Sequence, residues 1–283
     1  MKPDVKLFNL PNLLTAGNML SGILSILCVF MGRFEWAPWF IFLGAIFDFL
    51  DGFAARLTKQ YSELGKQMDS LADMITFGVA PGIIMMVIIA ISIEMGSYPE
   101  GANVSEYADY VLEKWKLGLF HDSSIQFEGI YKYLPFLGLI IPVFSLFRLA
   151  KFNIDTRQSE SFIGMPTPAV TLFFTSFPLA LWWYFSTEGF PPYFPEKIFQ
   201  PIFVCSLVVL MSLSLVSEIP LFSLKFKNFK WKENEVRYIF LTVSLILILT
   251  TKVWAIALIV FLYPVFSIIS RKPKNKTKKR NEV

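Results

Sequence analysis

Residues 48–73 read DFLDGFAARLTKQYSELGKQMDSLAD, and the interpretation of the whole chain depends on this stretch. It carries two pairs of aspartates, Asp48 with Asp51 and Asp69 with Asp73. Spacings of three and four residues place the members of each pair on one helical face. Buried carboxylates need a partner, and oxygen ligands alone suit hard divalent cations such as Mg²⁺ or Mn²⁺. The stretch therefore predicts two helices that hold metal ions, and two such ions suit phosphoryl transfer.

The rest of the chain is strongly apolar. Of its 283 residues, 54% are hydrophobic and 17% are charged, whereas soluble proteins average about 25% charged residues. The mean hydropathy is +0.54. We therefore expect a single domain over residues 1–283 with an all-α polytopic membrane fold. The apolar runs predict about eight transmembrane helices, at residues 13–31, 36–56, 69–94, 133–152, 166–185, 198–222, 238–250 and 253–269.

The basic residues predict the orientation of these helices in the cell membrane. If the N-terminus is cytoplasmic, 20 of the 26 Lys and Arg residues fall on the cytoplasmic side, as the positive-inside rule favours. Both termini and the aspartates then face the cytoplasm, and the acidic loop 95–131, with a surface helix expected at 104–119, faces outside. The basic tail 271–283 is better explained by attraction to anionic membrane lipids than by nucleic-acid binding. We expect no nucleic-acid partner.

The aspartate stretch also resembles a known family. The resemblance rests on residues at fixed spacing, Asp48-x-x-Asp51-Gly52-x-x-Ala55-Arg56 and then Gly65-x-x-x-Asp69-x-x-x-Asp73. This looks like the motif of the CDP-alcohol phosphotransferases, with every position filled. The resemblance implies a core of six catalytic helices, a homodimer, and an enzyme that transfers a phosphatidyl group from a CDP-lipid to an alcohol and releases CMP.

The resemblance and the chemistry together suggest roles for individual residues. Asp48, Asp51 and Asp69 are expected to bind two divalent metal ions, Mg²⁺ or Mn²⁺. Asp73 is expected to share the second ion and, by resemblance, to act as general base on the attacking hydroxyl. Gly52 lacks a side chain, so a nucleotide can approach the backbone there. The residues expected to contact the CDP-lipid are Asn12, Thr15, Gly52, Ala55, Arg56 and Gly65.

Three further stretches bear on the acceptor alcohol. PNLLTAGNMLSG at 11–22, LADMITFGVAP at 71–81 and FRLAKFN at 147–153 look like the integral-membrane phosphatidylserine synthase branch. That branch implies CDP-diacylglycerol as donor and L-serine as acceptor. Arg148 and Lys151 are then candidates to pair with the serine carboxylate or the diphosphate.

Other interpretations remain open at this point. Arg148 and Lys151 can also be simple anchors at a cytoplasmic helix end. Together with Arg157 they can bind the phosphate of a glycerol 3-phosphate or inositol phosphate acceptor. Intramembrane carboxylates also occur in transporters, although the acids here lie near one membrane face and no internal repeat is visible.

Overall fold

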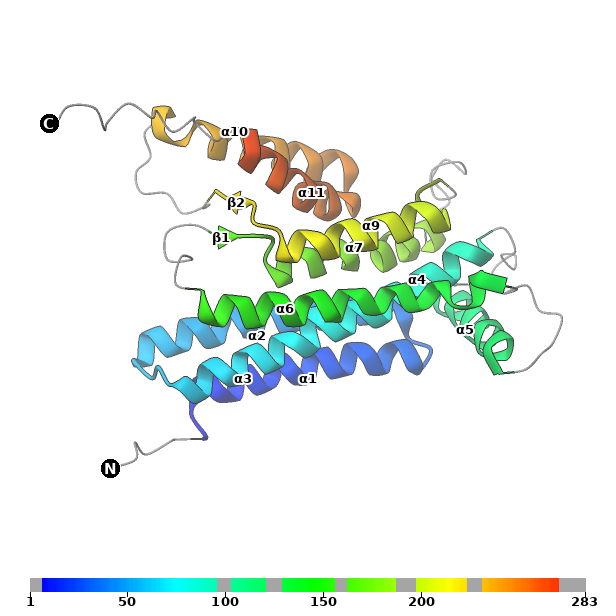
Figure 1. The fold of residues 1–283 in the computed structure, drawn as a ribbon, viewed down its shortest axis with the longest axis horizontal. Helices are drawn as coiled ribbons and strands as arrows, with labels where there is room; N and C mark the ends of the chain where they lie inside the picture. The colour runs from blue at the N-terminus through cyan, green and yellow to red at the C-terminus, as the bar shows by residue number, and fades with distance from the viewer. Residues whose placement is uncertain are drawn as a thin grey trace, which may run out of the picture.

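A computed structural model describes residues 7–95, 103–120, 129–155, 162–186, 197–222 and 231–269. The predicted basic tail 271–283 lies outside these residues, as does part of the acidic loop. Within the described residues, eight helical segments run back and forth between two ends of one bundle, each antiparallel to the segment before it (Figure 1). We call the end where α2 meets α3 the aspartate end. α1 begins and α11 finishes at this same end.

The long helices carry almost all of the regular structure. Their bounds are α1 Leu10–Phe30, α2 Ala37–Thr58, α3 Glu63–Met74, α4 Ala80–Glu94, α6 Ile140–Ile154, α7 Thr167–Ser186, α9 Pro201–Val216, α10 Trp231–Thr251 and α11 Trp254–Ile269. A π-helical turn, Ile75–Val79, joins α3 to α4, and a 3₁₀ turn, Leu134–Leu139, leads into α6. Two more 3₁₀ turns, Phe34–Trp36 and Gly129–Lys132, and a short antiparallel pair, β1 Phe162–Ile163 with β2 Pro220–Leu221, complete the elements outside α5.

Five helical segments in the described part of the chain are long and apolar enough to cross a membrane. They are Leu10–Phe30, Glu63–Glu94, Leu134–Ile154, Thr167–Ser186 and Asn234–Thr251, and two shorter apolar helices are Pro201–Val216 and Trp254–Ile269. The predicted all-α polytopic membrane fold is confirmed, and each predicted apolar segment coincides with a helical segment.

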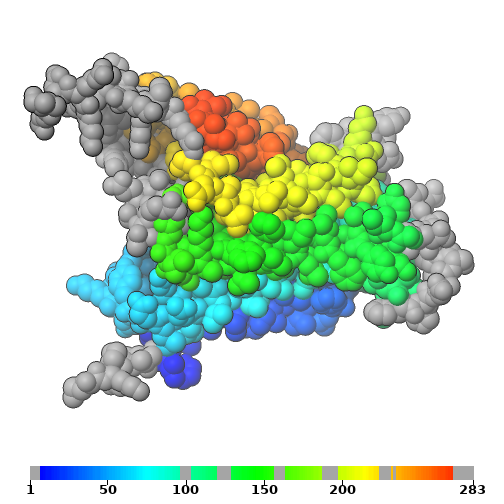
Figure 2. Space-filling model, in the orientation of Figure 1, coloured from blue at the N-terminus to red at the C-terminus, as the bar shows by residue number. Residues whose placement is uncertain are grey.

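The helical segment that carries Asp69 and Asp73 is the central one. In an 18-residue apolar stretch of Glu63–Glu94, 72% of the residues are buried, compared with 11% in Asn234–Thr251. Figure 2 shows the order of the helices across the bundle: α1–α3 (blue to cyan) come first, α6 and α9 follow, and α10 and α11 (orange to red) come last. The chain therefore builds its core around the helix that bears two of the four aspartates.

Pro81 lies in this central helix, and the structure shows how the backbone adapts. Proline has no N–H and cannot donate to the carbonyl one turn earlier, that of Phe77. The Thr171 hydroxyl from α7 lies within hydrogen-bond distance of this Phe77 oxygen, at 2.8 Å, and of the Thr167 carbonyl oxygen, at 2.9 Å. The π-helical turn Ile75–Val79 lies just before the proline. Such turns shift the register of side chains within a helix and are frequent at functional sites.

The aspartate end is organised by its helix caps. The Asn9 side chain accepts a hydrogen bond from the Asn12 backbone and starts α1. α2 ends at Thr58, and the residue that caps it, Lys59, adopts the left-handed conformation with φ 56°. Ser62 then caps α3 by accepting from the Gly65 backbone at 2.9 Å. The link between the aspartate pairs is therefore short and fixed at both ends.

Three helix bounds differ from the prediction by six or seven residues, for local physical reasons. α9 ends at Val216 instead of 222, because Ser217 is extended and Pro220 cannot continue a helix. α3 begins at Glu63, before the apolar run, because Ser62 caps it. α10 begins at Trp231, because its first turns are polar and hydropathy identifies only the apolar part of a helix.

The surface helix expected at 104–119 is α5, Val104–Phe120. It lies at the end of the bundle opposite the aspartates (Figure 1). Tyr107, Val111 and Trp115 are buried, so one face of α5 packs onto the bundle and closes that end.

Candidate functional site

Three of the predicted metal ligands come together at the aspartate end. Asp48 and Asp51 from α2 and Asp69 from α3 each offer one carboxylate oxygen, and these oxygens all lie within 4.8 Å of one another. Asp51 is 6% exposed and the other two are half-buried. The ion pairs among the described residues do not involve any of these carboxylates. Three crowded carboxylates without a cation from the chain fit a site for hard divalent cations.

Asp73 lies one turn farther along α3 and is 9% exposed. Its Oδ1 accepts a hydrogen bond from Nδ2 of Asn18 in α1, over 3.0 Å. It is not part of the three-carboxylate cluster. The structure thus separates the four aspartates into three crowded carboxylates and a fourth that is held by an amide.

α1 contributes a second contact, one turn before Asn18. The Thr15 hydroxyl donates to Oδ2 of Asp51 over 2.6 Å and lies 3.1 Å from the Pro11 carbonyl oxygen. The contact with Asp51 is charge-assisted and shorter, which favours it for the single hydroxyl proton. α1 therefore orients one carboxylate on α2 and one on α3.

A cavity of about 210 Å³ opens beside the three carboxylates. Its lining comes from the start of α1, the end of α2 and the start of α3: Pro11, Asn12, Thr15, Asp51, Gly52, Ala55, Gln60, Tyr61, Ser62, Gly65, Lys66 and Asp69. Five of the six predicted CDP-lipid contacts are in this lining. The sixth, Arg56, is exposed, and its Nη2 lies 4.0 Å from the place where a Cβ on Gly52 would be. Arg56 therefore borders the cavity near Gly52.

The two predicted glycines have different roles in the cavity wall. Among the described residues, a Cβ on Gly52 would meet only the end of the Arg56 side chain, so none of them fills the space in front of Gly52. A Cβ on Gly65 would lie 3.1 Å from the Ser62 hydroxyl and 3.3 Å from Oδ1 of Asn12. Gly52 leaves room for a ligand, whereas Gly65 lets α3 approach α1.

Sequence reasoning missed several residues of the lining, chiefly in the α2–α3 link. Gln60, Tyr61 and Ser62 lie there, and Lys66 lies on the first turns of α3. The Lys66 ammonium donates to the Asn153 carbonyl oxygen at 3.0 Å and so connects α3 to the end of α6. The available signal was the short polar link itself, with Ser62 placed three residues before Gly65 as a helix cap.

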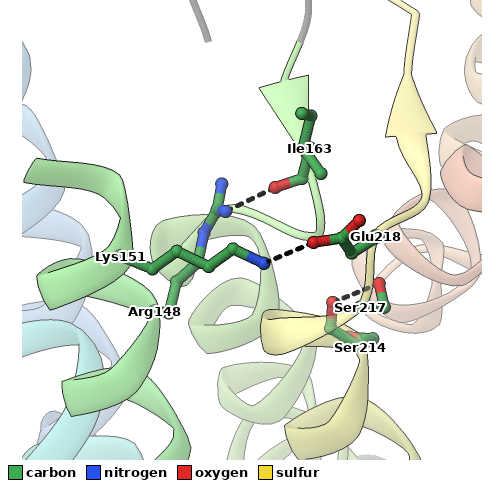
Figure 3. Close-up of polar contacts among 6 residues, drawn as sticks. All are labelled: Arg148, Lys151, Ile163, Ser214, Ser217 and Glu218. Atoms are coloured by element: carbon green, nitrogen blue, oxygen red, sulfur yellow. Dashed lines mark hydrogen bonds and ion pairs between the residues drawn. The ribbon is translucent and has the colours of Figure 1, made fainter. Parts of the chain in front are cut away.

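Arg148 and Lys151 lie apart from this lining, on α6. Figure 3 shows both reaching toward β1 and the segment after α9. Arg148 is 4% exposed and donates to the carbonyl oxygens of Ile163 and Gly164. Lys151 pairs with the Glu218 carboxylate at 3.0 Å. The structure therefore places the two predicted acceptor-binding cations side by side, each with a partner from the chain.

Comparisons with known proteins point to one family. A family model described as CDP-alcohol phosphatidyltransferase matches residues 8–97, which include the four aspartates and the cavity lining. A CDP-diacylglycerol–serine O-phosphatidyltransferase of Helicobacter pylori is 30% identical over 269 residues, covering 94% of this chain and 92% of the relative. One of Bacillus subtilis is 30% identical over 181 residues, covering 61% and 79%. An archaetidylserine synthase of Methanothermobacter thermautotrophicus is 31% identical over 173 residues, covering 60% and 58%.

Proposed function

Because the chain belongs to the CDP-alcohol phosphatidyltransferase family of membrane transferases, we propose that it transfers the phosphatidyl group of CDP-diacylglycerol to L-serine. The products are phosphatidylserine and CMP. The observation that carries the proposal is the convergence of Asp48, Asp51 and Asp69 beside a cavity lined by five of the six predicted nucleotide contacts. The names of the Helicobacter and Bacillus relatives support serine as the acceptor.

The proposed reaction is a single displacement at phosphorus. The serine hydroxyl oxygen forms a bond to the phosphorus that carries diacylglycerol, the bond from that phosphorus to the CMP oxygen breaks, and CMP departs. Asp73 takes the hydroxyl proton as general base, which requires hydrogen-bond distance between its carboxylate and the acceptor. The cavity holds the nucleotide, with the open face of Gly52 toward the ligand and Arg56 at its edge.

We propose that the aspartates hold two divalent cations, Mg²⁺ or Mn²⁺. Asp48, Asp51 and Asp69 are the ligands, and Asp73 shares the second ion. Bound there, the cations neutralise the diphosphate and the charge that develops on the leaving CMP. The family is divalent-metal dependent, and the acidic cluster offers the oxygen donors that these ions prefer.

Recognition of serine is proposed to use Arg148 and Lys151. Arg148 has five N–H donors, and the two carbonyls leave some of them for a carboxylate. The Lys151–Glu218 pair is partly exposed, with Glu218 at 65%, and exposed pairs contribute only about 0–1 kcal/mol. A substrate carboxylate can therefore replace Glu218 at little cost.

The remaining features of the proposal concern topology and assembly. We place both termini and the active site on the cytoplasmic side, with residues 271–283 as a basic tail next to anionic lipids. The first six helical segments form the catalytic core of one domain, and two chains form a homodimer. Single-cysteine labelling from each side of sealed vesicles checks the sidedness, and light scattering in detergent checks the dimer.

The test is CMP release by the purified protein from CDP-diacylglycerol with Mg²⁺ or Mn²⁺. Serine, glycerol 3-phosphate, inositol phosphate and inositol are compared as acceptors. Release that depends on serine supports the proposal. Release with another acceptor overturns the choice of serine but keeps the chemistry, and no release with any acceptor favours a carboxylate-lined transporter.

The role of Asp73 has its own test. Asp73→Asn keeps the shape of the side chain but removes its basicity, so kcat should fall by about 10²–10⁴-fold. Binding of CDP-diacylglycerol to the variant should remain. Near-normal turnover of Asp73→Asn would show that another group accepts the proton.

A further inference from the structure

Asn18 makes a contact that the proposed reaction does not yet explain. This residue of α1 is fully buried, at 0% exposure, and its Nδ2 donates to Oδ1 of Asp73 over 3.0 Å. Its other polar atom, Oδ1, has no hydrogen-bond partner among the residues that the structure describes. A buried acceptor without a donor disfavours folding. An asparagine at this position therefore lowers stability, and the contact with Asp73 is the feature that can explain its presence.

The opposite orientation of the amide would be worse. It would point the amide oxygen at the Asp73 carboxylate, and two acceptors cannot share a hydrogen bond. An ionised Asp73 therefore selects the orientation in which Asn18 donates. The contact uses Oδ1 of Asp73 and leaves Oδ2 without a donor among the described residues.

Close packing holds Asn18 in its place. The Thr76 hydroxyl, from the π-helical turn after Asp73, donates to the Asn18 carbonyl oxygen at 2.9 Å. A Cβ on Gly22 would lie 2.5 Å from the Thr76 hydroxyl, and a Cβ on Gly44 would lie 2.5 Å from its methyl group and 3.2 Å from Oδ1 of Asn18. α1, α2 and the π-helical turn meet here at distances that only glycine permits. The Asn18 backbone is therefore held against Thr76, and its amide lies beside the α2 backbone at Gly44.

We propose that Asn18 is a positioning residue for the reaction: it fixes the Asp73 carboxylate so that Oδ2 faces the acceptor hydroxyl. The π-helical turn Ile75–Val79 packs against α1 and α2 at Gly22 and Gly44. This packing determines which residue of α1 lies beside Asp73, and that residue is Asn18. Thr15, one turn earlier, does the same for a carboxylate of the metal cluster, so α1 orients the two kinds of aspartate separately. This inference rests on the proposed function, in which Asp73 takes the proton.

Two substitutions separate positioning from stability. Asn18→Leu has a similar branched shape and removes the unpaired oxygen, which favours folding, but it also leaves Oδ1 of the buried Asp73 without its donor, which disfavours folding. The two effects oppose each other, so the melting temperature of this variant should change only slightly. Its kcat should nevertheless fall about 10- to 100-fold, the usual effect of losing a residue that orients a ligand group. Asn18→Ala should show the same loss of kcat. The KM for CDP-diacylglycerol should stay within about twofold for both, the scatter of unrelated sites.

Ser25→Ala is the matched control. Ser25 is also fully buried on α1, and its hydroxyl donates to the Ala37 carbonyl oxygen away from the aspartates. This variant should lose some stability and keep its kcat. In an Asp73→Asn background, Asn18→Leu should cause no further loss, because the group that it orients no longer acts as a base.

The outcomes distinguish a failure of the positioning role of Asn18 from a failure of the proposed function. An active wild type whose Asn18→Leu and Asn18→Ala forms keep kcat within about twofold overturns the positioning role alone. A further loss of activity when Asn18→Leu is added to Asp73→Asn overturns it as well. No CMP release by the wild type with any acceptor overturns the proposed function, and this role with it.

Discussion

The two ends of the central helical segment, Glu63–Glu94, bury acidic residues in opposite ways. At one end Glu94 is 3% exposed, and its carboxylate pairs with the Lys114 ammonium from α5. Its backbone carbonyl accepts the Tyr107 hydroxyl at 2.7 Å. At the other end Asp69 lies within 4.8 Å of two more carboxylates and has no cationic partner among the described residues.

This difference separates structural charge from functional charge. A buried carboxylate that the chain itself neutralises helps to fix one packing, here that of α5 on the bundle. Crowded carboxylates that the chain leaves without a cation raise the energy of the fold, and they persist where a ligand compensates for them. The comparison therefore predicts that substitutions at the two ends will affect stability and activity in opposite directions.

The largest effect is expected from Asp69→Asn. Loss of one metal ligand should lower CMP release by about 10³-fold or more, since bound cations supply several kcal/mol of transition-state stabilisation. In EDTA the variant should melt at the wild-type temperature or higher, because one of three mutually repelling carboxylates becomes neutral. Thermal melts in detergent and steady-state CMP release measure both quantities.

Glu63→Gln is the control for this experiment. Glu63 is an exposed acid on the first turn of the same α3 helix and does not belong to the cluster. This substitution should leave CMP release unchanged. A clear loss of stability for Asp69→Asn in EDTA would mean that the aspartate end is neutralised by the chain after all.

The aspartate end was the more predictable of the two ends from sequence. Its information is local: spacings of three and four residues, a short polar link and a cap lie within residues 48–73. The contacts that complete it are not local. Asn18 and Asp73 are 55 residues apart, and Lys66 and Asn153 are 87 apart. Spacing rules cannot pair side chains across such distances, because the pairing depends on how the helices pack.

Lys114→Met should have the second largest effect, on stability instead of activity. Removing one partner of a buried ion pair leaves the Glu94 charge uncompensated, which costs about 3–5 kcal/mol. The melting temperature should fall, while kcat of the molecules that remain folded stays at the wild-type value. Replacing Glu94 as well, in Glu94→Met/Lys114→Met, should recover much of the loss.

The same helix supplies a matched control for the ion pair. Lys116 and Glu113 are 3.9 Å apart and both about 70% exposed, with side-chain exposures of 69% and 70%. Such a pair contributes about 0–1 kcal/mol, so Lys116→Met should hardly change the melting temperature. Equal effects of Lys114→Met and Lys116→Met would remove the contrast between the two ends.

From the sequence, α5 was predicted only as a surface helix, although the sequence also indicates that one of its faces is buried. Tyr107, Val111 and Trp115 recur every four residues, which marks one buried face of a helix. Because polar residues lie between them, the average hydropathy of the segment does not reveal this face. The partner of Glu94 could not be identified in advance, because Lys114 reaches it from another helix.

Metal binding should stabilise one end only. Mg²⁺ or Mn²⁺ at 100 times its dissociation constant should stabilise the wild type by about 2.7 kcal/mol, measured as a shift in melting temperature relative to EDTA. Asp69→Asn should lose this shift, whereas Lys114→Met should keep it from a lower starting temperature. An equal shift in Asp69→Asn would place the metal site elsewhere.

The smallest effect distinguishes two glycines on α2. At Gly44 a Cβ would lie 2.5 Å from the Thr76 methyl group, whereas at Gly52 it would meet, within the described part of the chain, only the Arg56 Nη2 at 4.0 Å. Gly44→Ala should therefore lower the melting temperature. Gly52→Ala should raise stability by about 0.5–1 kcal/mol, the gain of alanine over glycine within a helix. The methyl group at Gly52 points into the space reserved for the nucleotide, so the KM for CDP-diacylglycerol should rise while the fold improves. An unchanged KM for Gly52→Ala would show that the open space in front of this glycine is not where the nucleotide binds.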